Sequence, residues 1–334
     1  MVKKVMNDPD TYVEEVIEGF VRAYGRYVRK LEGYRVLVRR NLEDKKVGIL
    51  IGGGSGHEPF FTMMVGKGMA DASVYGNIFA APVPKDILAA TREINRGEGV
   101  IYVYGNYTGD NLNFDMAREL AEMEGIRVGM VRIWDDITSA PKGREEERRG
   151  IAGDFFVVRI AGACSDAGYS FEEAMRVIEK ARDNTRSIGI ALAPGTLPTT
   201  GKKTFELGED EIEIGMGAHG EKGVFRGKMK PARELVKMMM DLLFEDGEYK
   251  EGDEVCVLIN GMGSTTYGEL CLAYKEVDEY LKKREVRVYS VDIGNFLTTQ
   301  EMAGFSITLF LLDEELKKLY DTPVDTPTYK KFGG

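Results

Sequence analysis

The sequence predicts an α/β protein made of two α/β domains with mixed and parallel sheets. Short apolar runs that end in glycine alternate with amphipathic segments of helical period, which is the pattern of an α/β domain. The chain has 334 residues, more than a single compact core usually takes. Its composition is 43% apolar and 30% charged, which is typical of a globular protein and excludes extended disorder.

In the first domain, residues 10–31 carry apolar side chains at three- and four-residue steps, which predicts one long helix. The apolar run 47–51 ends in glycines, which predicts a buried strand. The remaining elements are predicted as helices at 84–97, 112–124 and 171–184, and as strands at 100–104 and 128–133.

The second domain begins near residues 185–195, and we place the boundary so that the domains are 1–187 and 188–334. Its strands are predicted at 188–192, 211–214, 255–259, 286–291 and 307–311, and its helices at 232–244 and 267–283. The Pro-, Gly- and Thr-rich segment 193–201 is predicted as a loop. The charged run 142–149 is predicted as a solvated loop or helix start, and the tail 322–334 as irregular.

Charge and rare residues exclude several classes of protein. Lys+Arg 45 against Asp+Glu 55 gives a net charge of −10, which disfavours a surface for nucleic acid or anionic membranes. No apolar run is long enough to span a bilayer, and the N-terminus lacks the apolar segment of a secretory signal. Three cysteines without a C-x-x-C pair predict reduced thiols in the cytoplasm, and abundant Glu and Lys beside one Gln suggests a heat-adapted source.

The glycine-rich segment 52–59, with the sequence GGGSGHEP, directly follows the predicted strand 47–51. Open α/β sheets bind ligands at this position, and glycines let the backbone approach a ligand closely. The dinucleotide fingerprint fails because His57 occupies the place of its third glycine. A Walker phosphate loop fails too, because no Ser or Thr follows Lys67. The alternative is a turn-rich loop whose His57 only hydrogen-bonds the backbone.

Two further segments carry candidate chemistry. Residues 105–115 contain Asp110, which either caps the following helix or accepts a proton from an alcohol. Residues 215–223 contain His219, whose neutral imidazole can act as nucleophile or base. Only two histidines are present, which excludes a His-rich metal centre. The sequence favours a cleft between the domains lined by His57, Asp110 and His219, against two unrelated core histidines.

These three segments, in this order and spacing, resemble the substrate-binding subunit of dihydroxyacetone (glycerone) kinase. Residues 66–69 and 260–265 agree as well, so the resemblance covers nearly the whole chain. It implies a homodimer in which His219 adds to the ketone as a covalent hemiaminal, His57 assists proton transfer, and Asp110 takes the proton of the attacking hydroxyl. The residues that it implies as the lining of the substrate pocket are Gly53, Gly54, Ser55 and Gly56.

One position departs from the family pattern, since Gly105 stands where members often have a lysine. This substitution removes a cation and leaves room, so a longer ketose such as erythrulose is an alternative to dihydroxyacetone. The resemblance places ATP or ADP with Mg²⁺ on a separate nucleotide-binding subunit, with ATP exchange or a phosphoenolpyruvate-dependent phosphocarrier as the phosphoryl source. Because the chain ends soon after the substrate-binding half, we expect it to need that partner. A ketone-binding co-regulator and a nucleotide-dependent oxidoreductase are the two competing functions.

Overall fold

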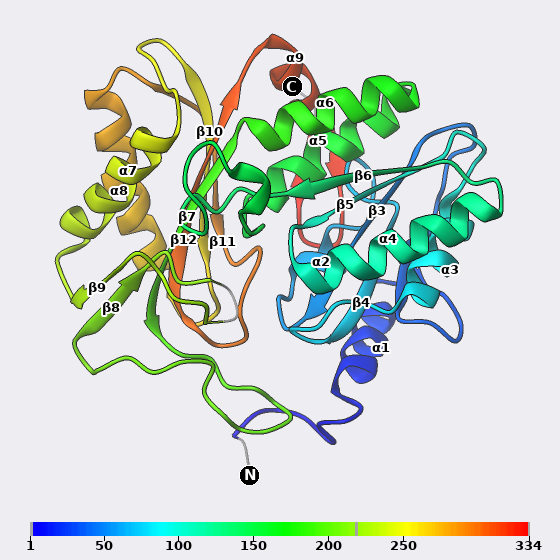
Figure 1. Cartoon of the computed structure of the whole chain (residues 1–334), viewed down its shortest axis with the longest axis horizontal. Helices are drawn as coiled ribbons and strands as arrows, with labels where there is room; N and C mark the ends of the chain where they lie inside the picture. The colour runs from blue at the N-terminus through cyan, green and yellow to red at the C-terminus, as the bar shows by residue number, and fades with distance from the viewer. Residues whose placement is uncertain (1–2, 218–219, 333–334) are drawn as a thin grey trace. The chain divides into compact units, whose positions relative to one another are not determined.

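The structure, a computed structural model, describes residues 3–217 and 220–332. It forms two compact units. Unit 1 comprises Met1–Ile133, Phe155–Arg182 and Glu315–Gly334, and unit 2 comprises Trp134–Asp154 and Asp183–Glu314. Figure 1 labels the helices and strands of both units. No helix in the two described stretches is long and apolar enough to cross a membrane.

Unit 1 is built on a six-stranded sheet with the order β1-β2-β4-β3-β5-β6. These strands are β1 (Val28–Lys30), β2 (Val36–Arg39), β3 (Gly48–Ser55), β4 (Ala72–Ile78), β5 (Val100–Gly105) and β6 (Val128–Ile133). The strands β3 to β6 run parallel, whereas β1 and β2 are antiparallel additions. β3 is buried along nearly its whole length, as expected for a parallel strand covered on both faces.

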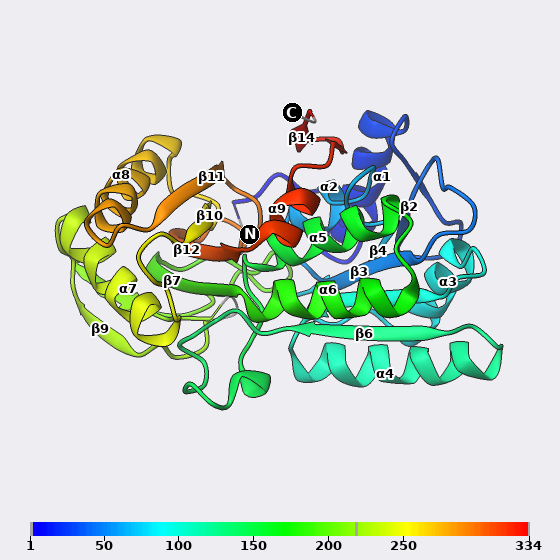
Figure 2. The same cartoon turned by 90° about the horizontal axis from the view of Figure 1, so that it is seen from above.

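Helices cover both faces of this sheet. They are α1 (Tyr12–Tyr24), α2 (Phe60–Met63), α3 (Pro84–Ile94), α4 (Thr108–Met123), α5 (Asp154–Asp166), α6 (Phe171–Asp183) and α9 (Glu314–Tyr320). Figure 2 shows α4 on one side of β6 and α6 on the other. Phe114 of α4 is fully buried and stacks on Tyr104 of β5, with ring centroids 4.2 Å apart. Burying a side chain of this size stabilises the fold by about 1.5–3 kcal/mol, so the contact fixes α4 on β5.

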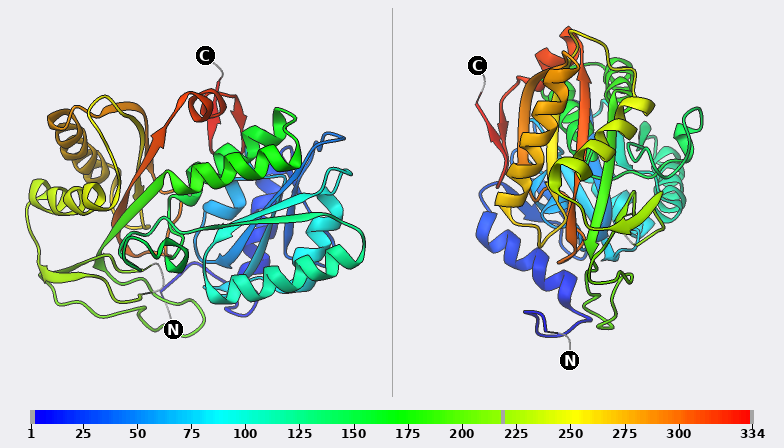
Figure 3. Two further views of the ribbon diagram at one scale, coloured as in Figure 1. Left: turned by 45° about the horizontal axis from the view of Figure 1, so that its top comes forward. Right: turned by 90° about the vertical axis from the view of Figure 1, so that its left-hand side faces the viewer.

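Unit 2 contains a second six-stranded sheet, with the order β11-β10-β12-β7-β8-β9. These strands are β7 (Thr185–Ala193), β8 (Glu211–Ile214), β9 (Phe225–Lys228), β10 (Glu254–Gly261), β11 (Arg287–Gly294) and β12 (Ala303–Leu312). The pair β10 and β11 is parallel and the other pairs are antiparallel. Two helices, α7 (Ala232–Asp246) and α8 (Tyr267–Lys283), pack side by side against this sheet (Figure 3). The mixed α/β fold predicted from the sequence is confirmed.

The sequence predicts a single boundary between residues 187 and 188, whereas the two compact units interleave along the chain. Segment 134–154 joins unit 2 because the Ser187 N–H donates to the Asp135 carbonyl oxygen at 2.7 Å. Segment 315–334 joins unit 1, where Arg159 donates to the carbonyl oxygen of Tyr320 at 2.9 Å. Both placements depend on contacts between distant segments, which a pattern along the chain does not record.

Several local predictions agree with the structure only in part. The predicted helix 10–31 ends at Tyr24, because Val28 pairs with Arg39 in the sheet instead of continuing the helical face. The run 142–149 is mostly exposed and contains a short 3₁₀ helix, Glu145–Glu147, as predicted, but Arg148 is buried and pairs with Asp246. The tail is not irregular throughout, since β13 (Val324–Asp325) pairs with β14 (Lys330–Lys331).

Candidate active site

The order of the strands in unit 1 marks one position at the edge of the sheet. From β3 the chain passes to β4 on one side, and from β5 it passes to β6 on the other side. Where consecutive connections leave neighbouring parallel strands in opposite directions, their carboxyl ends frame a crevice that commonly binds ligands. His57 lies two residues after the end of β3 at Ser55, and Asp110 follows the end of β5 at Gly105. The topology therefore places both sequence-predicted side chains at this switch point.

The glycines at the end of β3 are required by close backbone contacts. A Cβ atom on Gly53 would lie 2.6 Å from the ring of Phe61. A Cβ atom on Gly54 would lie 2.8 Å from the Ala80 nitrogen and 2.9 Å from the Phe79 Cα. Gly56 has a φ of +99°, a backbone conformation that glycine adopts without a steric penalty. These glycines let the turn after β4 cross directly over the end of β3.

Ser55 and His57 are both buried in this loop. The Ser55 hydroxyl donates to the Gly76 carbonyl oxygen at 2.8 Å, which ties the end of β3 to β4. The His57 ring packs against Phe79, with ring centroids 5.1 Å apart and the planes inclined by 42°. Phe79 has a φ of +55°, so the turn after β4 is held in an unusual conformation beside the histidine.

Asp110 occupies the first turn of α4, which begins at Thr108 and not at the predicted residue 112. A carboxylate there is stabilised by the positive end of the helix dipole. The start of α4 packs on the same turn after β4. Asn113 Nδ2 donates to the Pro82 carbonyl oxygen at 2.8 Å, and a Cβ on Gly109 would meet the Ala81 methyl at 3.4 Å. The turn 79–82 therefore contacts both the His57 loop and the Asp110 helix.

His219, the third predicted site residue, lies outside the described residues. The segment that leads to it is braced within unit 2. A Cβ on Gly215 would lie 2.7 Å from the Thr138 hydroxyl, and Asp136 accepts hydrogen bonds from Thr138 Oγ1 at 2.6 Å and Arg149 Nη2 at 2.8 Å. Burial raises the pKa of Asp136 although Arg149 opposes the shift. This bracing was not anticipated from the sequence, where the only signal was an acidic pair, Asp135 and Asp136, just after a strand.

The turn 79–82 was also missed, although two prolines, Pro82 and Pro84, mark a chain reversal in the sequence. In the described parts of the chain, no group of three or more His, Cys, Asp or Glu side chains is placed to hold a metal ion.

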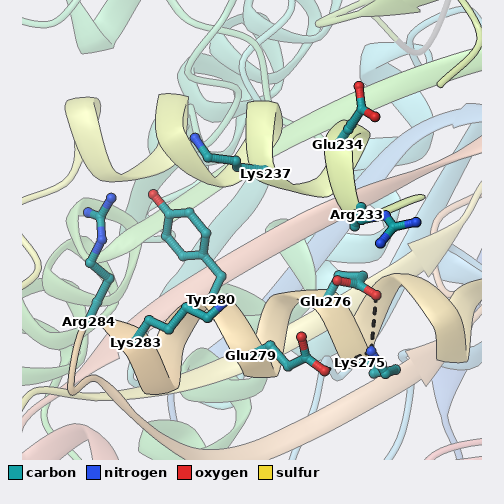
Figure 4. Close-up of a pocket in the computed structure, with 9 residues that line it drawn as sticks. All are labelled: Arg233, Glu234, Lys237, Lys275, Glu276, Glu279, Tyr280, Lys283 and Arg284. Carbon is teal, nitrogen blue, oxygen red and sulfur yellow. Dashed lines mark hydrogen bonds and ion pairs between the residues drawn. The ribbon is translucent and has the colours of Figure 1, made fainter. Parts of the chain in front are cut away.

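A surface groove of about 630 Å³ lies between α7 and α8 in unit 2 (Figure 4). Among its charged side chains, Lys275 pairs with Glu276 at 3.1 Å and with Glu279 at 2.7 Å. Tyr280 donates to Asp241 at 2.8 Å, and burial of the phenol raises its pKa to about 12. This groove contains neither of the sequence-predicted residues His57 and Asp110, so the switch point of unit 1 remains the candidate site.

Comparison with known proteins identifies the family of the chain. Residues 18–328 match the Dak1 domain. The chain belongs to the Dak1 family. It is 45% identical to the dihydroxyacetone-binding subunit DhaK of PTS-dependent dihydroxyacetone kinase 2 from Listeria innocua, over 98% of this chain and 99% of that protein. It is 38% identical to D-erythrulose kinase from Mycolicibacterium smegmatis, over 98% of this chain but 56% of that protein.

Two solved structures resemble the Dak1 chain over most of its length. The dihydroxyacetone kinase of C. freundii superimposes with a TM-score of 0.91 and 32% identity, covering 99% of this chain and 61% of that one. The dihydroxyacetone kinase operon co-activator Dha-DhaQ superimposes with a TM-score of 0.88 and 31% identity, covering 93% and 96%. The resemblance to the dihydroxyacetone kinase family, stated from the sequence, is confirmed.

Proposed function

We propose that this Dak1 chain is the ketose-binding subunit of a dihydroxyacetone kinase, a phosphotransferase with an alcohol group as acceptor. The observation that carries the proposal is the convergence of the His57 loop and the Asp110 helix on one turn at the switch point of unit 1. The relative from Listeria innocua, which matches end to end and is named as a dihydroxyacetone-binding subunit, supports it.

The proposed mechanism has two parts. The unprotonated ring nitrogen of His219 adds to the ketone carbon as the C=O π bond breaks; the other ring nitrogen releases its proton and the carbonyl oxygen takes one up, which gives a neutral hemiaminal. This bond makes the later transfer effectively intramolecular for a small ligand. Asp110 then accepts the proton of the primary hydroxyl of the ketose. At the same time the oxygen of that hydroxyl attacks the phosphorus of the donor, and the bond from phosphorus to the leaving group breaks. His57 hydrogen-bonds the substrate and relays protons. The backbone of Gly53, Gly54, Ser55 and Gly56 lines the ketose.

The identity of the ketose is the finer part of the proposal. Dihydroxyacetone is the leading substrate, and erythrulose is the alternative. Gly105, the last residue of β5, brings no side chain to the switch point. One relative in the family is named D-erythrulose kinase, and erythrulose is a four-carbon ketose. This name supports erythrulose as the alternative substrate. Measuring kcat/KM for dihydroxyacetone and for erythrulose with the partner subunit present would show which of the two is the preferred substrate.

The phosphoryl donor is assigned to a separate nucleotide-binding subunit of the DhaL type. ATP or ADP would be held on that partner, and its Mg²⁺ ions would neutralise the negative charge of the transferring phosphoryl group. A phosphoenolpyruvate-dependent phosphocarrier is the proposed alternative to ATP exchange, because the relative from Listeria innocua is named PTS-dependent. We further propose that the chain forms a homodimer. We also propose a cytoplasmic location, because the described cysteines, Cys164, Cys256 and Cys271, are free thiols.

Ketose phosphorylation with the partner present tests the proposal. Asp110→Asn should lower the rate by about 100-fold or more, because a positioned general base contributes that much. Asp115→Asn is the matched control on the same helix, since Asp115 pairs with Arg132 at 2.9 Å, away from the first turn. Equal rates for Asp110→Asn and the wild type would refute the role of Asp110.

A ketone-binding co-regulator is the second candidate function, favoured by the similarity to the co-activator Dha-DhaQ. A co-regulator would bind the ketose and leave it unphosphorylated with every phosphoryl-donating partner supplied. Turnover of the ketose in the same assay would exclude it.

A further inference from the structure

Another pocket of unit 1, of about 590 Å³, lies beside the C-terminal strands β13 and β14. Four cations and two carboxylates line it together with two neutral polar side chains: Arg26, Arg39, Lys67, Lys330, Glu43, Asp325, Tyr27 and Asn41. Figure 2 shows the C-terminal strands near α1 and α2, whose following segments contribute to this pocket. Lys67 is one of the lining residues, and it does not belong to a Walker phosphate loop because no Ser or Thr follows it.

The glycines on either side of Lys67 have a structural role. A Cβ on Gly66 would lie 2.6 Å from the Asp325 carbonyl oxygen, and a Cβ on Gly68 would lie 2.4 Å from that of Pro323. The Asp325 N–H donates to the Lys67 carbonyl oxygen at 3.0 Å. Glycines are therefore needed for the C-terminal segment to dock by its backbone. This docking uses only the Lys67 main chain and leaves its exposed side chain at the pocket.

Because four cations and only two carboxylates line the pocket, it has an excess of positive charge in a protein of net charge −10. Arg39 is anchored from behind by Asp71 at 3.3 Å and Asp166 at 2.9 Å, both largely buried. Lys330 pairs with Asp325. Within the described part of the chain, neither Arg26 nor Lys67 forms a direct ion pair; Asp325, which interacts electrostatically with Arg26, is paired with Lys330. Two cations therefore remain available for an anionic ligand.

The hydrogen-bond donors, the aromatic ring and the volume of the pocket indicate which class of anion it can bind. The Arg26 and Lys67 side chains and the Asn41 amide are donors of the kind that binds phosphate oxygens, whereas the Tyr27 hydroxyl already donates to Asp325 at 3.3 Å. The centroid of the Tyr27 ring lies 4.7 Å from the Arg26 guanidinium carbon and 4.9 Å from Lys330 Nζ. Because these two cations already contact the ring, stacking of a nucleobase on Tyr27 is disfavoured. A volume of about 590 Å³ exceeds what inorganic phosphate fills and suits a small organic ligand.

We propose that this pocket binds a small aliphatic phosphate monoester through Arg26 and Lys67, with Arg39 fixed in place by its buried carboxylates. The proposal does not depend on the function proposed above, although the product of that reaction would belong to the same ligand class.

Isothermal titration at low salt tests this site on the full chain, with glycerol 3-phosphate as the probe. The wild type should show saturable binding, and Arg26→Gln/Lys67→Gln should weaken it at least tenfold. A charge-matched control, Lys202→Gln/Lys318→Gln, removes two exposed lysines outside the pocket and should bind like the wild type. An unchanged thermal midpoint in both double variants shows that the fold is retained.

Two other probes define the ligand class. Glycerol should not bind, and AMP should bind more weakly than glycerol 3-phosphate. The site is overturned if the wild type shows no saturable binding, or if both double variants bind alike. The aliphatic assignment is overturned if AMP binds as tightly as glycerol 3-phosphate and loses its affinity in Arg26→Gln/Lys67→Gln.

Discussion

Both carboxylate oxygens of Glu58 accept the backbone N–H of Gly56, at 3.0 and 3.1 Å. His57 is the residue between these two, so the hydrogen bond constrains the backbone on both sides of the proposed catalytic histidine. Burial raises the pKa of Glu58, and the Gly56 hydrogen bond opposes the shift. Glu58 therefore positions the loop that presents His57.

Glu58→Gln should lower kcat/KM for ketose phosphorylation by about tenfold, since a hydrogen bond to a charged group is worth about 1.5–3 kcal/mol. Because the folded pKa of Glu58 is raised, the wild type should lose activity on acidification at a higher pH than an ordinary glutamate would cause. Glu58→Gln should lack this acid limb. Glu98→Gln, an exposed control, should keep both rate and pH profile; identical profiles in all three proteins would contradict the role.

Gly54 and Gly109 face the same turn with different clearance. A Cβ on Gly54 would press on the backbone of residues 79 and 80, whereas one on Gly109 would make an ordinary contact at 3.4 Å. Gly54→Ala should therefore cost about 1–3 kcal/mol of unfolding free energy and weaken ketose binding. Gly109→Ala, inside a helix, should be neutral or stabilising. Chemical denaturation and ketose titration of both variants check this, and equal losses would show that the turn does not constrain the loop.

Asp135 makes the stability of unit 2 depend on pH. Its carboxylate accepts the Ile151 N–H at 2.8 Å and the Gly153 N–H at 2.9 Å. Burial raises its pKa to about 6. A raised carboxyl pKa gives stability that is complete below the ordinary value near 4 and is lost as pH rises to the folded value.

The unfolding free energy of the wild type relative to Asp135→Asn should therefore fall by about 3 kcal/mol from pH 4 to pH 7, at 1.36 kcal/mol per pKa unit. Denaturant titrations at four pH values measure it. The exposed control Asp44→Asn should show no such trend, and a flat difference for Asp135→Asn would mean that Asp135 titrates normally.

The proposed homodimer gives a role to an exposed apolar stripe on α4. Leu112, Met116, Leu120 and Met123 are 65%, 53%, 38% and 84% exposed and share one helix face. Beside α4, β6 is the edge strand of its sheet. A second copy packed on this stripe and edge would contribute toward the roughly 800 Å² per partner that a specific dimer buries.

Met116→Glu should then convert dimers to monomers in light scattering after size exclusion, whereas Leu272→Glu on α8 should not. A wild-type monomer, or a dimer unaffected by Met116→Glu, would remove the second copy from this face.

Local patterns predicted much of the fold. The strand 211–214 and the helix 267–283 have the predicted bounds in β8 and α8, because each combines clear periodicity with good end signals, such as the Thr266 and Glu269 capping box of α8. β4 was missed because its sequence, ASVYGNI, mixes small, polar and apolar residues without alternation. The burial of Arg148 was missed because its partner, Asp246, lies 98 residues away.

The site was predictable to a similar extent. Glycine-rich loops after apolar strands predicted that His57 and Asp110 lie at the ends of neighbouring strands, since loop position follows from strand position. The shared turn 79–82 was not predictable, because its contacts join segments that are separate in sequence. Nothing in the local pattern indicated that Glu58 would bond back to Gly56.

The central claim is covalent capture of the ketose by His219. Carbon-13 NMR of the protein with dihydroxyacetone labelled at the carbonyl carbon tests it, because hemiaminal formation turns that carbon from trigonal to tetrahedral. The wild type, His57→Ala and Asp110→Asn should each give a protein-bound tetrahedral resonance, and His219→Ala should give none. The same bound resonance in His219→Ala would contradict the account.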